Sequence, residues 1–191
     1  MIDDTDSYLS AQSETVNGCS EVQAGHGIVL RHPKKEDALA IHALIKQCPP
    51  LDLNSIYTYL LLSEHFSQTC VVAQGEQGPD GYLSAYIPPG KPDVIFVWQV
   101  AVHERARGQS LGRKMLLHLL SRPALATVRF IETTVGPDNA ASRGMFMGLA
   151  RKLQAEVSES ELFGSHLFGD AGHDDERLIR IGPMRLPPPD I

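Results

Sequence analysis

A strand, a short basic loop and a helix follow one another without interruption between residues 93 and 120. Residues 93–102 are rich in β-branched and aromatic side chains and are apolar on both faces, a pattern typical of a central strand. Apolar residues then recur at helical spacing over 110–120. A strand of this kind has to be covered on both sides, so the segment predicts a sheet with helices packed against it.

The loop between this strand and this helix has the chemistry of an anion site. The N–H groups in the first turn of a helix lack intrahelical partners, and the helix dipole makes that end positive. Gly108 allows the backbone to approach an anion closely. Positive charge is available from Arg105, Arg107, Arg113 and Lys114. The loop lacks the Gly-Lys-Ser/Thr ending of a P-loop and the GxGxxG pattern, so spacing alone leaves a phosphate site and an ordinary turn equally open.

Composition narrows the class of protein: the 191 residues carry 17 Lys and Arg against 23 Asp and Glu, a net charge of −6. A general nucleic-acid binder would show a basic excess or a basic stripe. The three cysteines, Cys19, Cys48 and Cys70, form no CxxC pair, so neither a zinc site nor a redox dithiol is predicted. No apolar run is long enough to span a bilayer, and residues 1–6 lack a basic signal region. We therefore expect a cytoplasmic protein with no nucleic-acid, membrane or metal partner.

Apolar runs and helical patterns alternate along one predicted domain, residues 27–183. Strands are expected at 27–31, 69–73, 81–87, 93–102, 128–135, near 155 and at 177–182, and helices at 38–48, from a cap at Asp52 or Asn54 through Leu62, at 110–120 and at 139–149. This order predicts an α/β or α+β domain around a mixed sheet. Residues 1–26 hold too few large apolar side chains to offset chain entropy and are expected to be a disordered or flexible arm, and 184–191 a proline-rich tail.

Two motifs carry a resemblance to the GNAT N-acetyltransferase superfamily. Residues 100–102 followed by Arg-Gly-Gln-Ser-Leu-Gly at 107–112 resemble the acyl-CoA pyrophosphate loop of that family, and residues 139–146 resemble its next helix. The resemblance implies the GNAT acyl-CoA N-acyltransferase fold, a mixed and mostly antiparallel sheet flanked by helices, with acetyl-CoA as co-substrate. It assigns acetyl-CoA binding to Val100, Val102, Arg107, Gly108, Gln109, Ser110, Leu111, Gly112, Asn139 and Ser142.

The chain departs from the GNAT pattern at two positions. Ser110 replaces the middle glycine of the loop. In a right-handed conformation Ser110 costs little and its hydroxyl can contact phosphate, whereas a positive φ introduces strain. Phe146 stands where many relatives have a tyrosine as general acid, so a mechanism that uses a tyrosine acid is not expected here.

Four further blocks, 49–55, 96–102, 133–139 and 180–183, resemble the diaminobutyrate acetyltransferases of ectoine biosynthesis. This narrower resemblance implies acetyl transfer from acetyl-CoA to the 4-amino group of L-2,4-diaminobutyrate, by direct attack in a ternary complex, and a homodimer. Two alternatives stay open: an acetyltransferase for another small amine or a protein N-terminus, and a non-catalytic acyl-CoA sensor.

Acetyl transfer requires a proton acceptor and an oxyanion donor. A primary amine has a pKa of about 10.4, so the site must take up a proton before the nitrogen attacks. Glu132 is the leading candidate base, because a carboxylate in a buried-looking strand needs a partner and such sites often have a perturbed pKa. Backbone N–H groups near Val100 are the candidate oxyanion donors if the strand splays from its neighbour. Cys48 and Cys70 have no recognisable histidine partner motif, so no acyl-enzyme is expected.

Acetylation of the distal nitrogen requires the α-ammonium and the carboxylate of the substrate to be held elsewhere. Besides Glu132, the candidate substrate-binding residues are Asp52, Tyr57, Trp98, His173 and Glu176. Asp52 is alternatively a helix N-cap, and Tyr57 a core residue. Trp98 is either core or a cation–π wall for an ammonium group. His173 and Glu176 belong to an acidic segment that is alternatively a solvated loop, and no metal site is expected there because no second histidine stands at a useful spacing. The resemblance continues into residues 181–183, and it is this that favours the two residues as substrate contacts.

Overall fold

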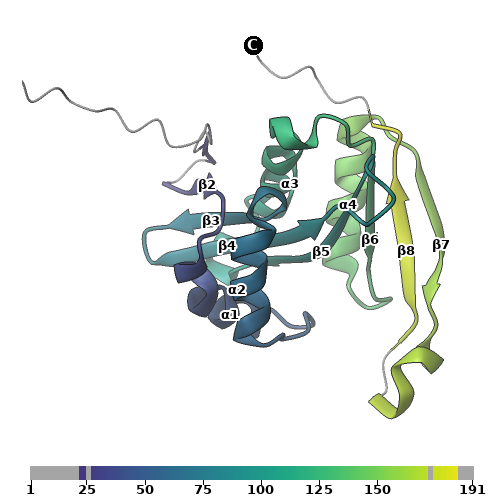
Figure 1. Cartoon of the computed structure of the whole chain (residues 1–191), viewed down its shortest axis with the longest axis horizontal. Helices are drawn as coiled ribbons and strands as arrows, with labels where there is room; N and C mark the ends of the chain where they lie inside the picture. The colour runs from purple at the N-terminus through teal and green to yellow at the C-terminus, as the bar shows by residue number, and fades with distance from the viewer. Residues whose placement is uncertain (1–21, 25–26, 172–173, 185–191) are drawn as a thin grey trace, which may run out of the picture.

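The computed structural model describes residues 22–24, 27–171 and 174–184 (Figure 1). Its strands are β1 (Val22–Gln23), β2 (Val29–Arg31), β3 (Val71–Gly75), β4 (Gly78–Tyr86), β5 (Val94–Val102), β6 (Phe130–Thr134), β7 (Val157–Phe163) and β8 (Glu176–Ile181). They form one sheet in the order β1-β2-β3-β4-β5-β6-β8-β7. Neighbouring strands are antiparallel except β5 and β6, which are parallel. The predicted mixed and mostly antiparallel sheet is confirmed.

Four α-helices pack on this sheet: α1 (Ala38–Lys46), α2 (Ile56–His65), α3 (Leu111–Leu120) and α4 (Ala140–Leu153). Strand β3 shows how they divide between the two faces. Val71 and Ala73 belong to the core under α3 and α4, while Val72 between them belongs to the core under α1 and α2. Because successive side chains of a strand point to opposite faces, the helix pairs cover opposite sides of the sheet. None of the helices in the described ranges is long and apolar enough to cross a membrane.

The structure changes both predicted ends of the domain. Val22 and Gln23 lie inside the predicted arm, yet they pair with β2. At the other end, Met184 is fully buried and its N–H donates to the carbonyl of Arg129, so it is part of the domain rather than of the tail. The remainder of both predicted segments, 1–21 and 185–191, lies outside the described residues.

The predicted cap of the second helix is wrong. Helix α2 begins at Ile56, and its N-cap is Ser55, whose side chain accepts a hydrogen bond from the Thr58 N–H at 3.3 Å. Serine is as good an N-cap as aspartate, and its position next to the helix decides between them. Asp52 and Asn54 lie in the loop that connects α1 to α2.

Strands β5 and β6 separate partway along their length, and this separation creates the site. The parallel ladder covers only Val94–Val97 of β5 and ends at the pair of Val97 with Thr133. The Thr133 hydroxyl donates to the Val97 carbonyl at 2.9 Å, so a side chain satisfies the group where the ladder stops. Beyond this point β5 runs on to Val102 beside β4, and no strand of the described residues lies next to its other edge. The splay that the oxyanion hypothesis required is present.

Candidate active site

A cleft opens where β5 parts from β6, between the free edge of β5, the loop before α2 and the start of α4. It comprises two adjoining cavities of about 390 and 590 Å³. They share the lining residues Pro50, Leu51, Val100, Asn139 and Ser142, so they form one continuous cleft. We call the first cavity the acidic lobe and the second the basic lobe.

Charge separates the two lobes. Asp52, Asp138, Asp174 and Glu176 line the acidic lobe, which has no Lys, Arg or His among the described residues that line it. The basic lobe is lined by Arg107 and Arg113, and no described carboxylate lines it. The cleft can therefore hold an anion at one end and a cation at the other.

The start of α3 forms the floor of the basic lobe. The residues there include Gly108, Ser110, Leu111 and Gly112. Gly108 has φ of 78°, and Ser110, the N-cap of α3, has φ of 56° and ψ of 27°. Ser110 thus adopts the left-handed conformation, the strained one of the two alternatives. Its hydroxyl accepts a hydrogen bond from the Arg113 guanidinium at 3.0 Å, so the serine orients a basic side chain of the lobe.

Gly112 is required by a close approach of three elements. A Cβ atom on Gly112 would lie 2.5 Å from the Met145 sulfur of α4 and 3.3 Å from a methyl group of Val100 in β5. The missing side chain lets the start of α3 sit against the strand edge and α4. Val100 and Val102, which were predicted to bind acetyl-CoA, line the lobe beside it.

Only two of the four basic side chains predicted for the loop line the lobe. Arg105 is ion-paired with Asp80, and the Lys114 ammonium donates to the Ala24 carbonyl at 2.8 Å. Arg107 and Arg113 line the lobe. Gln109, which was also predicted to bind acetyl-CoA, is not among the lining residues.

The start of α4 closes both lobes. Asn139 is the N-cap, and its side chain accepts the Ser142 N–H at 3.1 Å. Both residues line the two lobes, where they were predicted to contact acetyl-CoA. Phe146 is only 2 % exposed and lines the acidic lobe, and no tyrosine lines either lobe in the described part of the chain. The described lining of the cleft therefore offers no phenol group.

Cys48 also lines the basic lobe. Its thiol is buried and donates to the Val102 carbonyl at 3.6 Å. Burial raises the pKa of the Cys48 thiol, although Arg107 acts in the opposite direction. The neutral thiol is a poor nucleophile, which agrees with the prediction that no acyl-enzyme forms.

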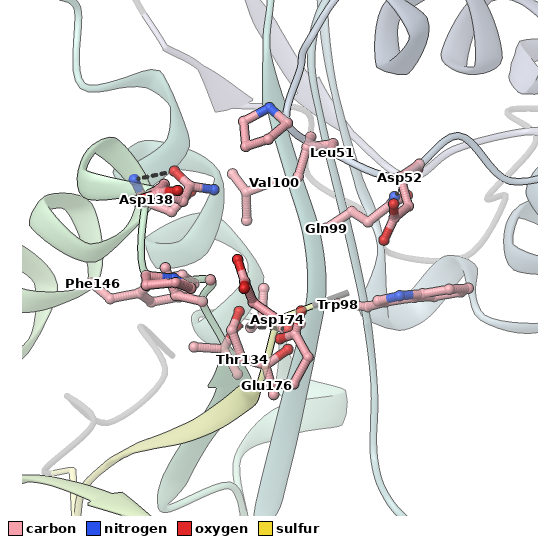
Figure 2. A pocket seen from close by; sticks show the side chains of 18 residues that line it. Leu51, Asp52, Trp98, Gln99, Val100, Thr134, Asp138, Phe146, Asp174 and Glu176 are labelled. Atoms are coloured by element: carbon pink, nitrogen blue, oxygen red, sulfur yellow. Dashed lines mark hydrogen bonds between the residues drawn. The ribbon is translucent and has the colours of Figure 1, made fainter. Parts of the chain in front are cut away.

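The acidic lobe collects residues from four separate segments (Figure 2). Asp52, Trp98 and Gln99 lie on one side of β5, Asp138 and Phe146 lie on the α4 side, and Asp174 lies between them. Trp98 is 42 % exposed, so it is a wall of the lobe and not a core residue. Glu176, which was predicted to contact the substrate, lies at the start of β8 and lines the same lobe.

Glu132 is not where the base hypothesis required it. It is 4 % exposed, ion-paired with Arg180 and with the Lys91 ammonium at 3.3 Å, and absent from the lining of both lobes. The neighbouring Ile131 points into the core under α3 and α4, so Glu132 points to the opposite face, where its cross-strand partner is Arg180. The carboxylate already has its counter-charges there, so this geometry does not support Glu132 as the base or as a substrate contact.

Two other predicted substrate contacts have different outcomes. Tyr57 is 67 % exposed and lines neither lobe, so neither the core interpretation nor the contact with substrate is supported. Tyr59, two residues further along α2, is the tyrosine of this helix that is buried. His173 lies outside the described residues.

Sequence reasoning missed several residues that line the acidic lobe: Leu51, Gln99, Thr134, Asp138 and Asp174. The first four lie inside the blocks 49–55, 96–102 and 133–139 that carried the narrower resemblance. Asp174 belongs to the acidic segment from which only its neighbours were chosen. The signal was present for each segment, but it did not single out the side chains that face the cleft.

Comparison with known proteins agrees with this geometry. Residues 38–149 match the acetyltransferase (GNAT) family. This range contains α1 through most of α4, including the splayed β5 and the whole of the basic lobe's loop. The chain belongs to the GNAT acetyltransferase family, and the predicted fold is confirmed.

Relatives narrow the class further. L-2,4-diaminobutyric acid acetyltransferase from Bordetella parapertussis is 59% identical over 160 residues, which cover 83% of this chain and 86% of that protein. The enzyme of the same name from Halomonas elongata is 44% identical over 159 residues, covering 83% and 82%. The diaminobutyrate acetyltransferase EctA from Paenibacillus lautus, solved with L-2,4-diaminobutyric acid and coenzyme A, superposes with a TM-score of 0.80 at 40% identity, covering 86% of this chain and 98% of that chain. The resemblance to diaminobutyrate acetyltransferases is confirmed.

Proposed function

We propose that this protein transfers the acetyl group of acetyl-CoA to the 4-amino group of L-2,4-diaminobutyrate in a ternary complex. The observation that carries the proposal is the division of charge within one cleft. Two arginines and a helix N-terminus suit the pyrophosphate of acetyl-CoA, and four carboxylates suit a substrate with two amino groups. The Paenibacillus lautus relative, solved with the diamino acid and coenzyme A, supports the pairing of these two ligands.

On this proposal the free edge of β5 aligns the acyl group. The N–H and C=O groups that β5 directs toward this edge beyond Val97 can hydrogen-bond an extended pantetheine chain, as a neighbouring strand would. A backbone N–H near Val100 then stabilises the oxyanion, because Val100 lines both lobes at their junction. Asn139 and Ser142 border the same junction and contact the acyl-CoA from the α4 side.

The acidic lobe holds the amine. Asp52, Asp174 and Glu176 pair with the α-ammonium group, and the face of Trp98 adds a cation–π contact, which leaves the distal amine directed toward Val100. The distal nitrogen gives up a proton to a lobe carboxylate, directly or through water, and attacks the thioester carbonyl. The C–N bond forms, the C–S bond breaks, and the thiolate leaves. Since a thiol of this kind has a pKa of about 8.5, it departs without a phenol to protonate it.

The product, N4-acetyl-L-2,4-diaminobutyrate, belongs on this proposal to the synthesis of the compatible solute ectoine under osmotic stress, in the cytoplasm. We also propose a homodimer. Helix α2 and the loop before it expose a cluster of large apolar side chains, Leu53, Ile56, Tyr57 and Leu60. An apolar surface of this kind beside a cleft is typical of a subunit contact, and light scattering of the pure protein measures the mass that decides it.

The proposed reaction is tested by mass spectrometry of products formed from acetyl-CoA and a panel of amines. L-2,4-Diaminobutyrate is compared with ornithine, lysine, a diamine without a carboxylate and an alanine-initiated peptide, and fragmentation locates the acetyl group. We expect monoacetylated diaminobutyrate carrying the group on the 4-nitrogen. Transfer only to another amine would overturn the substrate. Binding of acetyl-CoA in a calorimeter without acetyl transfer to any amine would favour the non-catalytic sensor.

A further inference from the structure

Gln99 is a buried side chain at the back of the acidic lobe. It is 4 % exposed, lines the lobe and belongs to the part of β5 that lies beyond its pairing with β6. Its amide nitrogen donates to the backbone carbonyl of Asp52 at 2.7 Å. Asp52 lies in the loop between α1 and α2, where the backbone has no helix or strand to hold it. A short, buried hydrogen bond therefore fastens the backbone of a lobe carboxylate to the sheet.

A β-bulge places Gln99 on the side where it can reach that loop. Ser84 of β4 pairs with Gln99, but the next residue, Ala85, pairs with Val97, so Trp98 is the extra residue of β5. Val97 points into the core under α3 and α4. Strict alternation would send Gln99 to that same face, whereas the bulge sets Trp98 and Gln99 together on the side of Asp52 (Figure 2).

The side-chain oxygen of Gln99 contacts a second buried group, the hydroxyl of Tyr59. The Tyr59 hydroxyl lies 3.5 Å from the Gln99 side-chain oxygen and accepts the N–H of Asn54 at 3.3 Å. Tyr59 is fully buried, with its ring edge-on to those of His42 and Tyr82 at centroid distances of 6.0 and 6.2 Å. Two residues of the same loop, Asp52 and Asn54, are thus connected to side chains that cannot move freely.

We infer that Gln99 is a positioning residue for the amine substrate: it fixes the backbone of Asp52, and so the place of its carboxylate, without contacting acyl-CoA. Its neighbour Val100 lines both lobes, but Gln99 lines only the acidic one. Loss of the Gln99 amide should therefore affect the two substrates unequally. The identity of the amine in this inference rests on the proposed function. The hydrogen bond by which Gln99 fixes the loop at Asp52 does not depend on it.

The variant Gln99→Met keeps the length of the side chain and removes its hydrogen bonds. We expect KM for L-2,4-diaminobutyrate to rise about tenfold, the factor that corresponds to one lost hydrogen bond. KM for acetyl-CoA should stay within about twofold of its value in the unmodified protein, because the basic lobe is untouched. Tyr59→Phe leaves the hydrogen bond from Gln99 to the Asp52 carbonyl in place and removes two longer contacts, 3.5 Å to Gln99 and 3.3 Å from the Asn54 N–H. The same KM should therefore rise less, about two- to threefold.

Ser84→Ala is the matched control. Ser84 is buried, lies opposite Gln99 in the ladder, and its hydroxyl has no hydrogen-bond partner among the described residues. Both KM values should be unchanged in this variant. Equal rises of both KM values in Gln99→Met, or no rise in either, would overturn the inference.

Amide hydrogen exchange separates this inference from the proposed function. Exchange at residues 51–55 should be faster in Gln99→Met than in Ser84→Ala, whichever amine the protein uses. If the unmodified protein fails to acetylate diaminobutyrate, the proposed function is lost, but the exchange result stands by itself. Equal exchange in the two variants contradicts the positioning role.

Discussion

The two lobes of the cleft are built in different ways. The basic lobe takes most of its lining from residues 100–113, a strand edge that continues into a loop and the first turn of α3, with α4 closing it. Besides its arginines it offers the backbone N–H groups at the start of α3, a left-handed serine and a glycine. The acidic lobe assembles side chains from the loop before α2, from β5, from the segment after β6 and from the start of β8. We therefore expect backbone geometry to control the binding of acetyl-CoA in the basic lobe. Side-chain charge should control the binding of the amine in the acidic lobe.

The largest effect is expected from a change of backbone clearance in the basic lobe. Gly112→Val forces a side chain against Met145 and Val100, so α3 has to move away from the strand edge. We expect kcat/KM for acetyl-CoA to fall about 100-fold, because a displacement of roughly 1 Å at a binding site has this cost. Initial-rate kinetics with each substrate varied in turn measure it.

Gly148→Ala is the control for that substitution. Gly148 lies in α4, and an added Cβ would meet only ordinary contacts, 3.6 Å or more from the nearest arginine atoms. Alanine is the better helix former by about 1 kcal/mol, so this variant should be active and slightly more stable. A loss of activity in both variants would show that any change near α4 is harmful and would remove the argument for Gly112.

A smaller effect is expected when charge is removed from the basic lobe. Arg113 lines the lobe, while the adjacent Lys114 turns away and donates to the Ala24 carbonyl. Arg113→Met should raise KM for acetyl-CoA about 20-fold, within the range for a charged hydrogen bond, and Lys114→Met should leave it unchanged. Calorimetric titration with coenzyme A at two salt concentrations tests the pair. Equal losses of affinity for coenzyme A in the two variants would show that both residues act only through their general positive charge.

The acidic lobe should respond to charge with the opposite selectivity. Asp174→Asn keeps the shape of the side chain and removes its charge, so KM for diaminobutyrate should rise about tenfold while KM for acetyl-CoA stays the same. Glu161→Gln, on the exposed strand β7, removes the same charge away from the cleft and is the control. If Asp174→Asn weakens the binding of acetyl-CoA instead, the assignment of one substrate to each lobe is wrong.

The smallest effect on either substrate is expected from a titration in the body of α3. Burial, with the charges of Arg122 and His32, lowers the pKa of His118 to about 4. The unfolded chain, with a pKa near 6.5, binds the proton first, so the free energy of unfolding falls as the pH drops from about 6.5 toward 4, by about 1–3 kcal/mol.

His118→Leu should flatten that part of the stability curve and leave both KM values at pH 7.5 within about twofold, because His118 lines neither lobe. Urea unfolding at pH 7 and pH 5 measures the effect. The same loss of stability at pH 5 in the variant and in the unmodified protein would assign the acid sensitivity to other groups.

Several parts of the site were open to prediction because they depend on residues close together in the chain. The run from β5 through the loop to α3 was predicted almost to the residue, and so was Asn139 at the start of α4, where its side chain accepts the Ser142 N–H. A hydrogen bond between residues three apart, and the free N–H groups in the first turn of a helix, depend only on the nearby sequence. Ser110 marks the limit, because its residue type allowed two conformations and the contacts around it selected one.

Other parts depended on which face of the sheet a side chain occupies. Glu132 has the composition expected of a base, yet alternation along β6 pairs it with Arg180 on β8, 48 residues later. Gln99 was not predicted as a site residue, because nothing in the nearby sequence reveals the bulge at Trp98 that turns its side chain toward Asp52. Tyr57 and Tyr59 are two residues apart on one helix, and only packing shows that the second is buried.

The amino-acid sequence alone therefore determined the class of fold, the anion-binding loop and the likeness to acyl-CoA-dependent acetyltransferases, since these follow from short-range patterns. The tertiary structure decided how many of the basic residues line the cleft, which carboxylates gather opposite them, and how the strand edge between the two lobes becomes free. The physical reason is that the acidic lobe forms only when β5 and β6 diverge and β8 pairs with β6. That arrangement depends on contacts between residues far apart in the chain.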